Sequence, residues 1–375
     1  MSKVKAVEGV RGTACLLVVF SHLSLTFFPY LHALAGKAGS SNQFQGFIHN
    51  SPFGFIYSGT AAVYIFFVLS GYILTYAALT GNSNTSSKLI AMSLKRYPRL
   101  MIPTTVSCVL AYVLFASIST DKTMLTDWII GYGKFNYSFI GAIYSGSVES
   151  FILGRSSYNW VLWTMKIELI GSFLVFIICF LRTKVRGGGV DFLCTAIIIT
   201  LMAFRLLSIS LGLGFIAFIS GHTFYYYGRP LPSTLAIPMF IFGLYLAGTH
   251  NDSSSYFLLS AIAGSRAYEL GNFVSGILIV YAAIFNDELN ALFSNKALVF
   301  MGKLSFSVYL IHLSIISTFG VLVFNLCREN YTYDISAILS SCITILSTYL
   351  MAIFYFYSLL SYNFQIKENC LQTTG

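Results

Sequence analysis

Charged residues are scarce in this chain. Lys, Arg, Asp and Glu together make up 9% of its 375 residues, against about 25% in soluble globular proteins. Hydrophobic residues reach 56% and aromatic residues 17%. A chain with so few charges cannot cover a folded surface with them, which excludes a soluble globular domain. The composition therefore predicts a protein that crosses the membrane several times.

Three further features are missing, and each excludes a class of protein. No cationic tract of the kind that binds nucleic acid accompanies the net charge of +9, so we expect no nucleic-acid partner. The seven cysteines are an odd number without a CxxC pair, so we expect neither a disulfide framework nor a metal site. Because no internal repeat, linker or second soluble domain is visible, we treat residues 1–375 as a single domain.

Long apolar segments recur along the whole chain. A membrane-spanning helix needs about 20 mostly apolar residues, and ten segments meet or approach this length. The expected fold is therefore all-α, a polytopic transmembrane bundle of about ten spans. The candidate spans lie near residues 10–30, 57–79, 98–118, 160–181, 190–209, 211–227, 233–248, 272–286, 304–326 and 335–361.

Basic residues are distributed unevenly between the two sides of this bundle. With the N-terminus in the cytoplasm, fourteen of the 22 Lys and Arg fall in inside segments and six in outside segments. Because cytoplasmic loops carry an excess of Lys and Arg, both termini are expected to be cytoplasmic and the number of spans even. Residues 119–159 then form the longest outside loop. Trp160 and Trp163 lie at the outer end of the fourth span, where aromatic residues gather at the boundary between membrane and water.

The stretch RGTACLLVVFSH places two unusual side chains in the first span. Arg11 and His22 are eleven residues apart, which puts them within about 20° of one helix face and about 16 Å apart along it. Arg11 then lies at the cytoplasmic mouth and His22 near the middle of the membrane. Ionisable groups at that depth are usually functional. The alternatives are that Arg11 only anchors the topology and that His22 only packs in the bundle.

The fourth span carries a carboxylate in the stretch WTMKIELIGSF. Glu168 lies about 12 Å below the outer interface by helical rise, a depth similar to that of His22. We expect the two side chains to pair, because a buried carboxylate needs a partner and can orient a histidine. The alternative is an ion pair between Glu168 and another helix.

The end of the second span and the start of the third carry two more motifs. GTAAVYIFFVLSGYILT contains Ser70, Gly71 and Tyr72, of which Gly71 could also serve only close helix packing. LKRYPRL puts Arg96 and Arg99 three residues apart, with Pro98 in the expected first helical turn. Two cations on one face could bind phosphate or could simply anchor the span in the cytoplasm.

The ninth span has a polar stripe in the stretch SFSVYLIHLSI. Ser305, Tyr309 and His312 are separated by four and three residues, so they share one helix face. The stripe is either a structural set of hydrogen bonds or part of a site. His222 and Arg205 are also buried candidates, but no pattern surrounds either of them.

Together these motifs resemble the acyltransferase-3 family of integral membrane acyltransferases. The arginine and histidine of the first span, FFVLSGY, KRYPR, LWTMKIE and SVYLIH follow one another in the order found in that family, from Arg11 to about His312. The resemblance implies transfer of an acyl group, commonly acetyl, from cytoplasmic acetyl-CoA to a hydroxyl of a surface glycan or lipid-linked saccharide. It also implies the bacterial inner membrane as the location, with membrane lipid as a partner.

The resemblance assigns expected roles to individual residues. His22 would act as a general base or carry the acyl group covalently, with Glu168 as its catalytic partner. The anionic end of acetyl-CoA would bind Arg11, Arg96 and Arg99. The expected substrate contacts are Ser70, Gly71, Tyr72, Trp163, Tyr309 and His312. The chain looks like the stand-alone form of the family, without an esterase-like domain after the last span.

A proton-coupled transporter or flippase is the competing interpretation. In such a protein His22 and Glu168 would form a proton relay, and broken helices would line a substrate path. No inverted repeat is visible in the sequence, which favours the acyltransferase.

Overall fold

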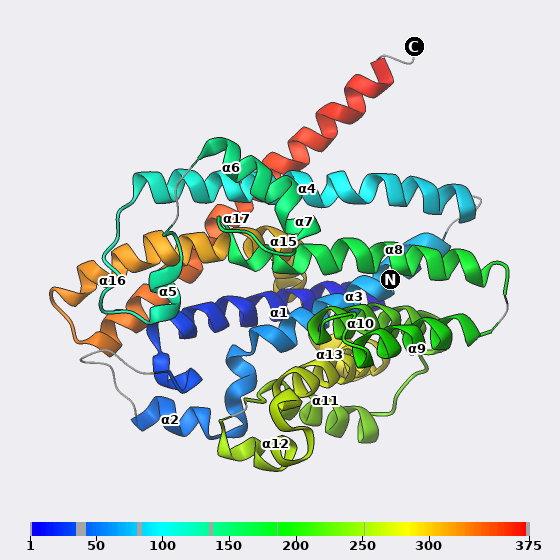
Figure 1. Ribbon diagram of the computed structural model, residues 1–375, viewed down its shortest axis with the longest axis horizontal. Helices are drawn as coiled ribbons and strands as arrows, with labels where there is room; N and C mark the ends of the chain where they lie inside the picture. The colour runs from blue at the N-terminus through cyan, green and yellow to red at the C-terminus, as the bar shows by residue number, and fades with distance from the viewer. Residues whose placement is uncertain are drawn as a thin grey trace.

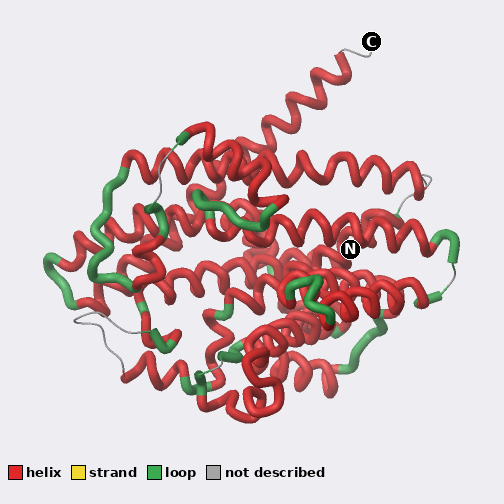
Figure 2. Tube along the Cα trace, viewed as in Figure 1, coloured by secondary structure: helices red, strands yellow, loops and turns green. Residues whose placement is uncertain are grey.

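The computed structural model is built from helices, and several of the longest follow one direction (Figure 1). It describes residues 2–34, 43–80, 85–134, 138–185, 187–250 and 252–372, and no strand occurs among them (Figure 2). The expected all-α fold is confirmed. The α-helices are α1 (Ser2–Phe27), α2 (Gln43–His49), α3 (Gly59–Leu79), α4 (Thr85–Ser117), α5 (Asp127–Gly131), α6 (Phe139–Tyr144), α7 (Ser150–Ile152), α8 (Thr164–Arg182), α9 (Gly189–Ala203), α10 (Ile209–Tyr227), α11 (Ser233–Ala247), α12 (Phe257–Ala263), α13 (Ala267–Phe285), α14 (Asp287–Phe293), α15 (Lys296–Ile315), α16 (Val321–Arg328) and α17 (Tyr333–Gln372).

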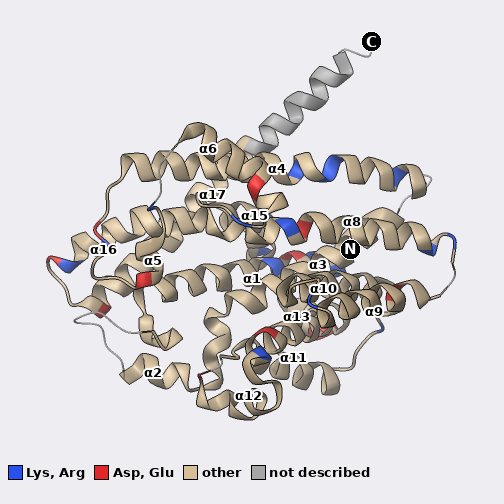
Figure 3. Ribbon diagram, in the orientation of Figure 1, with Lys and Arg blue, Asp and Glu red and all other residues tan. Residues whose placement is uncertain are grey.

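Short helical turns of other types connect or interrupt these helices. The 3-10 turns are η1 (Pro29–His32), η2 (Pro52–Tyr57), η4 (Trp160–Trp163), η5 (Ser254–Tyr256) and η6 (Gly264–Arg266), and the π-helical turns are η3 (Ser145–Glu149) and η7 (Ile316–Gly320). Charged residues are few along the ribbon, and several of them lie on α4 and α8 (Figure 3). These two helices are in contact with each other.

Eight helical segments in the described part of the chain are long and apolar enough to cross a membrane. They account for eight of the ten expected spans. The expected spans near 190–209 and 233–248 correspond to α9 and α11, which have 15 residues each and so extend about 22 Å. This is shorter than the roughly 30 Å hydrocarbon layer, so these two helices do not meet the length criterion.

The third span begins earlier than the sequence predicted. α4 starts at Thr85, which places Pro98 inside the helix and not in its first turn. A proline in a membrane helix is tolerated where neighbouring helices and side chains satisfy the freed backbone groups. Arg96 and Arg99 therefore lie in the middle of a 33-residue helix instead of at its start.

The segment expected to be one long outside loop is partly helical. Within residues 119–159, Phe139–Ile152 forms an apolar helical stretch whose Gly146 lies against the backbone of Thr105 in α4. The hydroxyl of Tyr97 in α4 donates to the carbonyl of Ser147 at 2.6 Å. This half of the loop is therefore held against the bundle.

Close backbone approach fixes two helix crossings. A Cβ on Gly302 of α15 would lie 1.9 Å from the carbonyl oxygen of Glu8 in α1. Likewise, a Cβ on Gly71 of α3 would lie 2.0 Å from the carbonyl oxygen of Phe218 in α10. Only glycine fits at such distances. The first crossing brings the helix of Arg11 and His22 against the helix of Tyr309 and His312, and the second assigns Gly71 a packing role.

Candidate active site

Two histidines meet where α1 and α15 pack together. Nε2 of His312 lies 2.9 Å from Nδ1 of His22, and the two ring centroids are 4.9 Å apart. His312 is fully buried, whereas His22 is partly exposed. The sequence predicted both as site residues but did not predict that they pair.

The carbonyl groups around the pair determine where its protons sit. Nδ1 of His312 lies 2.8 Å from the carbonyl oxygen of Tyr309, which can only accept, so this nitrogen carries hydrogen and Nε2 of His312 accepts. Nδ1 of His22 faces that acceptor and the carbonyl oxygen of Val18, at 3.1 Å, so it also carries hydrogen. Nε2 of neutral His22 is left with its lone pair. No hydrogen bond engages it within the residues the structure describes.

A large cavity lies between α1, α3, α4, α8 and α15. Its volume is about 610 Å³, within the usual range for small-molecule sites. One part of its lining is apolar and includes Phe66, Phe67, Ile73, Leu74, Met165 and Phe306. The other part carries six charged side chains, from Glu8, Arg11, Arg96, Arg99, Glu168 and Lys303. Four cations against two carboxylates make the cavity suited to an anionic ligand.

Tyr309 connects this cavity to the histidine pair. Its side chain lines the cavity, and its ring centroid is 6.0 Å from that of His312. The hydroxyl donates to the carbonyl of Val161 at 2.7 Å and lies 2.9 Å from the hydroxyl of Thr164. Val161 lies in η4, where the chain turns into α8. Tyr309 therefore lines the cavity and lies beside His312, whereas neither His22 nor His312 is among the residues that line it.

The expected pair of Glu168 and His22 does not form. Oε2 of Glu168 is 2.9 Å from Nη2 of Arg96, and Ser70 donates to Oε1 at 3.0 Å. Nε of Arg96 donates to the hydroxyl of Ser172 at 2.8 Å. Helical rise gave the depth of Glu168 in the bundle but not the direction in which it points. The alternative, an ion pair with another helix, is correct.

The three arginines expected to bind the donor all line the cavity. They differ in their partners, because Arg11 pairs with Glu8 at 3.2 Å and Arg96 is paired with Glu168. Arg99 forms no ion pair with any described residue, and neither does Lys303. The sequence did not single out Lys303, which lies two residues before Ser305 in α15. Two cations are thus available to a ligand.

The remaining expected substrate contacts divide into two groups. Ser70 and Tyr309 line the cavity, whereas Gly71, Tyr72 and Trp163 do not. The ring of Tyr72 packs against those of Tyr225 and Phe285, and Trp163 is 39% exposed in η4. The fold therefore does not bring these three residues to the cavity.

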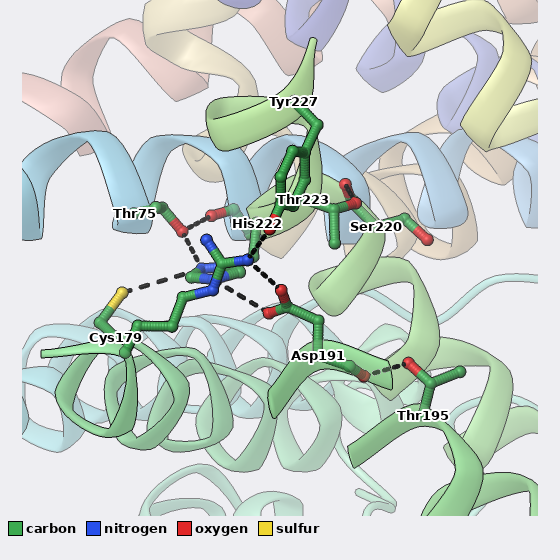
Figure 4. A network of polar contacts seen from close by, with 10 residues as sticks. Thr75, Cys179, Asp191, Thr195, Ser220, His222, Thr223 and Tyr227 are labelled. Atoms are coloured by element: carbon green, nitrogen blue, oxygen red, sulfur yellow. Dashed lines mark hydrogen bonds and ion pairs between the residues drawn. The ribbon is translucent and has the colours of Figure 1, made fainter. Parts of the chain in front are cut away.

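His222 belongs to a separate buried network (Figure 4). Nε2 of His222 lies 3.2 Å from Asp191, and Nδ1 lies 2.9 Å from the hydroxyl of Thr75. Arg182 reaches the same carboxylate and the hydroxyl of Tyr227, both at 2.5 Å. None of these residues lines the cavity. His222 therefore lies outside the cavity, and the network links α3, α8, α9 and α10.

A third group of histidines lies beyond the end of α1. Nε2 of His32 is 2.8 Å from the hydroxyl of Ser24, and its ring is near that of His250. Burial, together with the neighbouring His250, His49 and His22, lowers the pKa of His32 to about 3. His32 is therefore neutral at physiological pH and places no cation next to His22. Within the described residues no cluster of His, Cys, Asp or Glu could hold a metal ion.

A helical membrane bundle with a buried histidine pair, and with a cation-lined cavity that shares Tyr309 with the surroundings of that pair, has parts that suit a membrane-embedded group-transfer enzyme. The chain belongs to the acyltransferase-3 family, whose acyltransferase domain matches residues 4–357. The O-acetyltransferase PaAT-1 of Phomopsis amygdali is 23% identical over an alignment of 375 residues, which covers 84% of this chain and 72% of that relative. No solved structure matches the chain. The predicted family is confirmed, and with it acyl transfer as the class of reaction.

Proposed function

We propose that this protein transfers an acetyl group from cytoplasmic acetyl-CoA to a hydroxyl of a surface glycan or lipid-linked saccharide. The observation that supports the proposal is that Nδ1 of His22 lies 3.1 Å from the carbonyl oxygen of Val18 and 2.9 Å from Nε2 of His312, while no described residue hydrogen-bonds its Nε2. A neutral imidazole with one free nitrogen is the usual general base at physiological pH. The bacterial inner membrane is the proposed location.

The donor is proposed to bind in the cavity with its phosphates toward Arg99 and Lys303. Guanidinium groups bind phosphate through paired, charge-assisted hydrogen bonds. The apolar part of the lining, including Phe66 and Phe306, would hold the uncharged arm of the donor. Its thioester would then approach Tyr309 and the histidine pair.

The reaction follows from the protonation of this pair. Nε2 of His22 takes the proton of the acceptor hydroxyl as its oxygen attacks the thioester carbonyl. The carbon–sulfur bond then breaks, and the coenzyme A sulfur takes the proton from His22. During the reaction the imidazolium of His22 keeps its Nδ1 hydrogen bond to His312, which favours the charged form. Covalent transfer through an acyl-histidine would use the same nitrogen.

Replacing Arg99 with alanine is expected to weaken binding of coenzyme A about tenfold, because a charge-assisted hydrogen bond to phosphate is lost. Arg99→Lys should recover only part of the affinity, since lysine cannot bind in a bidentate manner. Isothermal titration with coenzyme A measures the change. Lys184→Ala, which removes an exposed cation outside the cavity, serves as the control. Unchanged affinity in Arg99→Ala would contradict a donor site in this cavity.

A further inference from the structure

The outer segment between α4 and η4 places an indole ring directly on His22. Trp128 of α5 stacks on the imidazole with ring centroids 5.5 Å apart and an angle of 22° between the planes. Trp128 also forms an edge-to-face contact with Trp160, at a centroid distance of 5.8 Å. The ring of His22 is therefore covered by Trp128, while its Nδ1 is held by Val18 and His312.

Several polar contacts hold Trp128 in this place. Thr126, two residues earlier, donates to the carbonyl of Leu25 in α1 at 2.6 Å. Nζ of Lys122 donates to the carbonyl of Tyr132 and to the hydroxyl of Ser317, both at 2.7 Å. Asn325 of α16 donates to the carbonyl of Asp121 at 2.9 Å. The segment that carries Trp128 is thus fixed to α1, η7 and α16 by hydrogen bonds. These contacts hold the indole ring in one position relative to His22.

We propose that Trp128 is a positioning residue that holds the imidazole ring of His22 and stabilises its protonated form during acyl transfer. The proposal rests on the proposed role of His22 as the proton acceptor. Indole presents the most negative face of the aromatic side chains, and a cation within about 6 Å of the ring centroid is attracted to it. Neutral imidazole gains much less, so the stack favours the state formed when Nε2 takes a proton.

The neighbouring histidines do not provide a negative charge that would stabilise the protonated imidazole of His22. His312 of α15 is the neutral acceptor for Nδ1. His32 of η1 contacts the end of α1 through Ser24, and its pKa of about 3 keeps it neutral. On α5 itself, Asp127 adjoins Trp128 in the sequence, and Asp127→Asn is therefore measured beside Trp128→Leu, with the acid limb expected to stay in place in Asp127→Asn. Since Glu168 is paired with Arg96, no carboxylate accepts the Nδ1 hydrogen of His22 among the described residues; His312 is its partner at that edge, and the indole contacts the face of the ring.

The pH dependence of turnover tests the proposal. Release of free coenzyme A from acetyl-CoA would be followed from pH 5 to pH 9 in membranes containing the protein, with membranes lacking it as the blank. In Trp128→Leu the plateau rate should fall about fivefold, and the acid limb should move to lower pH by about half a unit, because the imidazolium is less stable. Trp128→Phe should give a smaller change in both. Phe139→Leu, the same type of substitution at an exposed aromatic of the outer segment, should change neither.

A second measurement does not depend on activity. The chain has three tryptophans, so a Trp160→Phe, Trp163→Phe double variant leaves Trp128 as the only one. Its fluorescence should fall on acidification as His22 charges, and adding His22→Gln should abolish that fall. An acid limb that stays in place in Trp128→Leu, or a fluorescence titration that is the same with and without His22, would overturn the proposal. Absence of turnover in the unmodified protein would instead refute the proposed function, while the fluorescence result would still report on the stack.

Discussion

His22→Gln is expected to lower the turnover of acetyl-CoA at least about 100-fold, the usual contribution of a general base, without preventing folding. Glutamine can still donate a hydrogen bond toward Val18 and His312, but it has no basic nitrogen to take the place of Nε2. Release of free coenzyme A by membranes that contain equal amounts of folded protein measures the change.

Two other histidines supply the controls for this experiment. His250→Gln alters a histidine on the same side of the bundle that is hydrogen-bonded to Gly248, and it should leave the rate near that of the unmodified protein. His312→Gln keeps an acceptor for Nδ1 of His22 and should therefore be faster than His312→Leu. A His22→Gln variant that turns over acetyl-CoA at the unmodified rate would refute the mechanism, although not the family membership.

Glu168→Gln is expected to destabilise the protein by about 3–5 kcal/mol and to slow turnover more than tenfold. The substitution leaves Arg96 as an unpaired cation in a largely buried position, since only 12% of its side chain is exposed, and breaking a buried pair from one side has a cost of that size. It also releases Ser70 and Arg96 into the cavity, where they would disturb the bound donor. Unfolding in increasing sodium dodecyl sulfate measures stability, and coenzyme A release measures activity.

Removing both charges separates the two effects. A Glu168→Leu, Arg96→Met double variant contains no unpaired charge, so it should recover most of the stability, but it should not recover turnover. If the double variant were fully active, the pair would have no part in donor binding. If Glu168→Gln were as stable as the unmodified protein, the pair would not be buried as the structure shows.

The sequence predicted the parts of this molecule that depend on local pattern. Apolar runs located the eight helices of membrane-spanning length found in the described residues, and both Arg11 and His22 lie in α1, within the first expected span. The spacing of Ser305, Tyr309 and His312 in α15 likewise predicted one polar face. The window 190–209 ran past the end of α9 at Ala203, whereas the window 233–248 matched α11 but was counted as a span although it is shorter than about 20 residues.

What the sequence could not predict depends on rotation and on tertiary contact. His22 and His312 are 290 residues apart, and helical rise gives the depth of a side chain in the bundle but not the neighbour it faces. For the same reason Glu168 was paired with His22 in the prediction, whereas α8 turns it toward Arg96. Trp128 lies in α5, a short helix between α4 and α6, where neither hydropathy nor periodicity indicates a contact with α1.

The proposed reaction moves an acetyl group from a thioester to an oxygen. The most direct measurement supplies acetyl-CoA labelled in its acetyl group to purified protein in vesicles made from the lipids of its native membrane. We expect the label to leave coenzyme A and to appear in alkali-labile oxygen esters in the vesicle extract. The His22→Gln variant should give no such product. If the label crossed the membrane still attached to coenzyme A, the result would contradict the proposed transfer and favour a transporter. If the label remained a thioester while the protein was folded, the result would also contradict the proposed transfer.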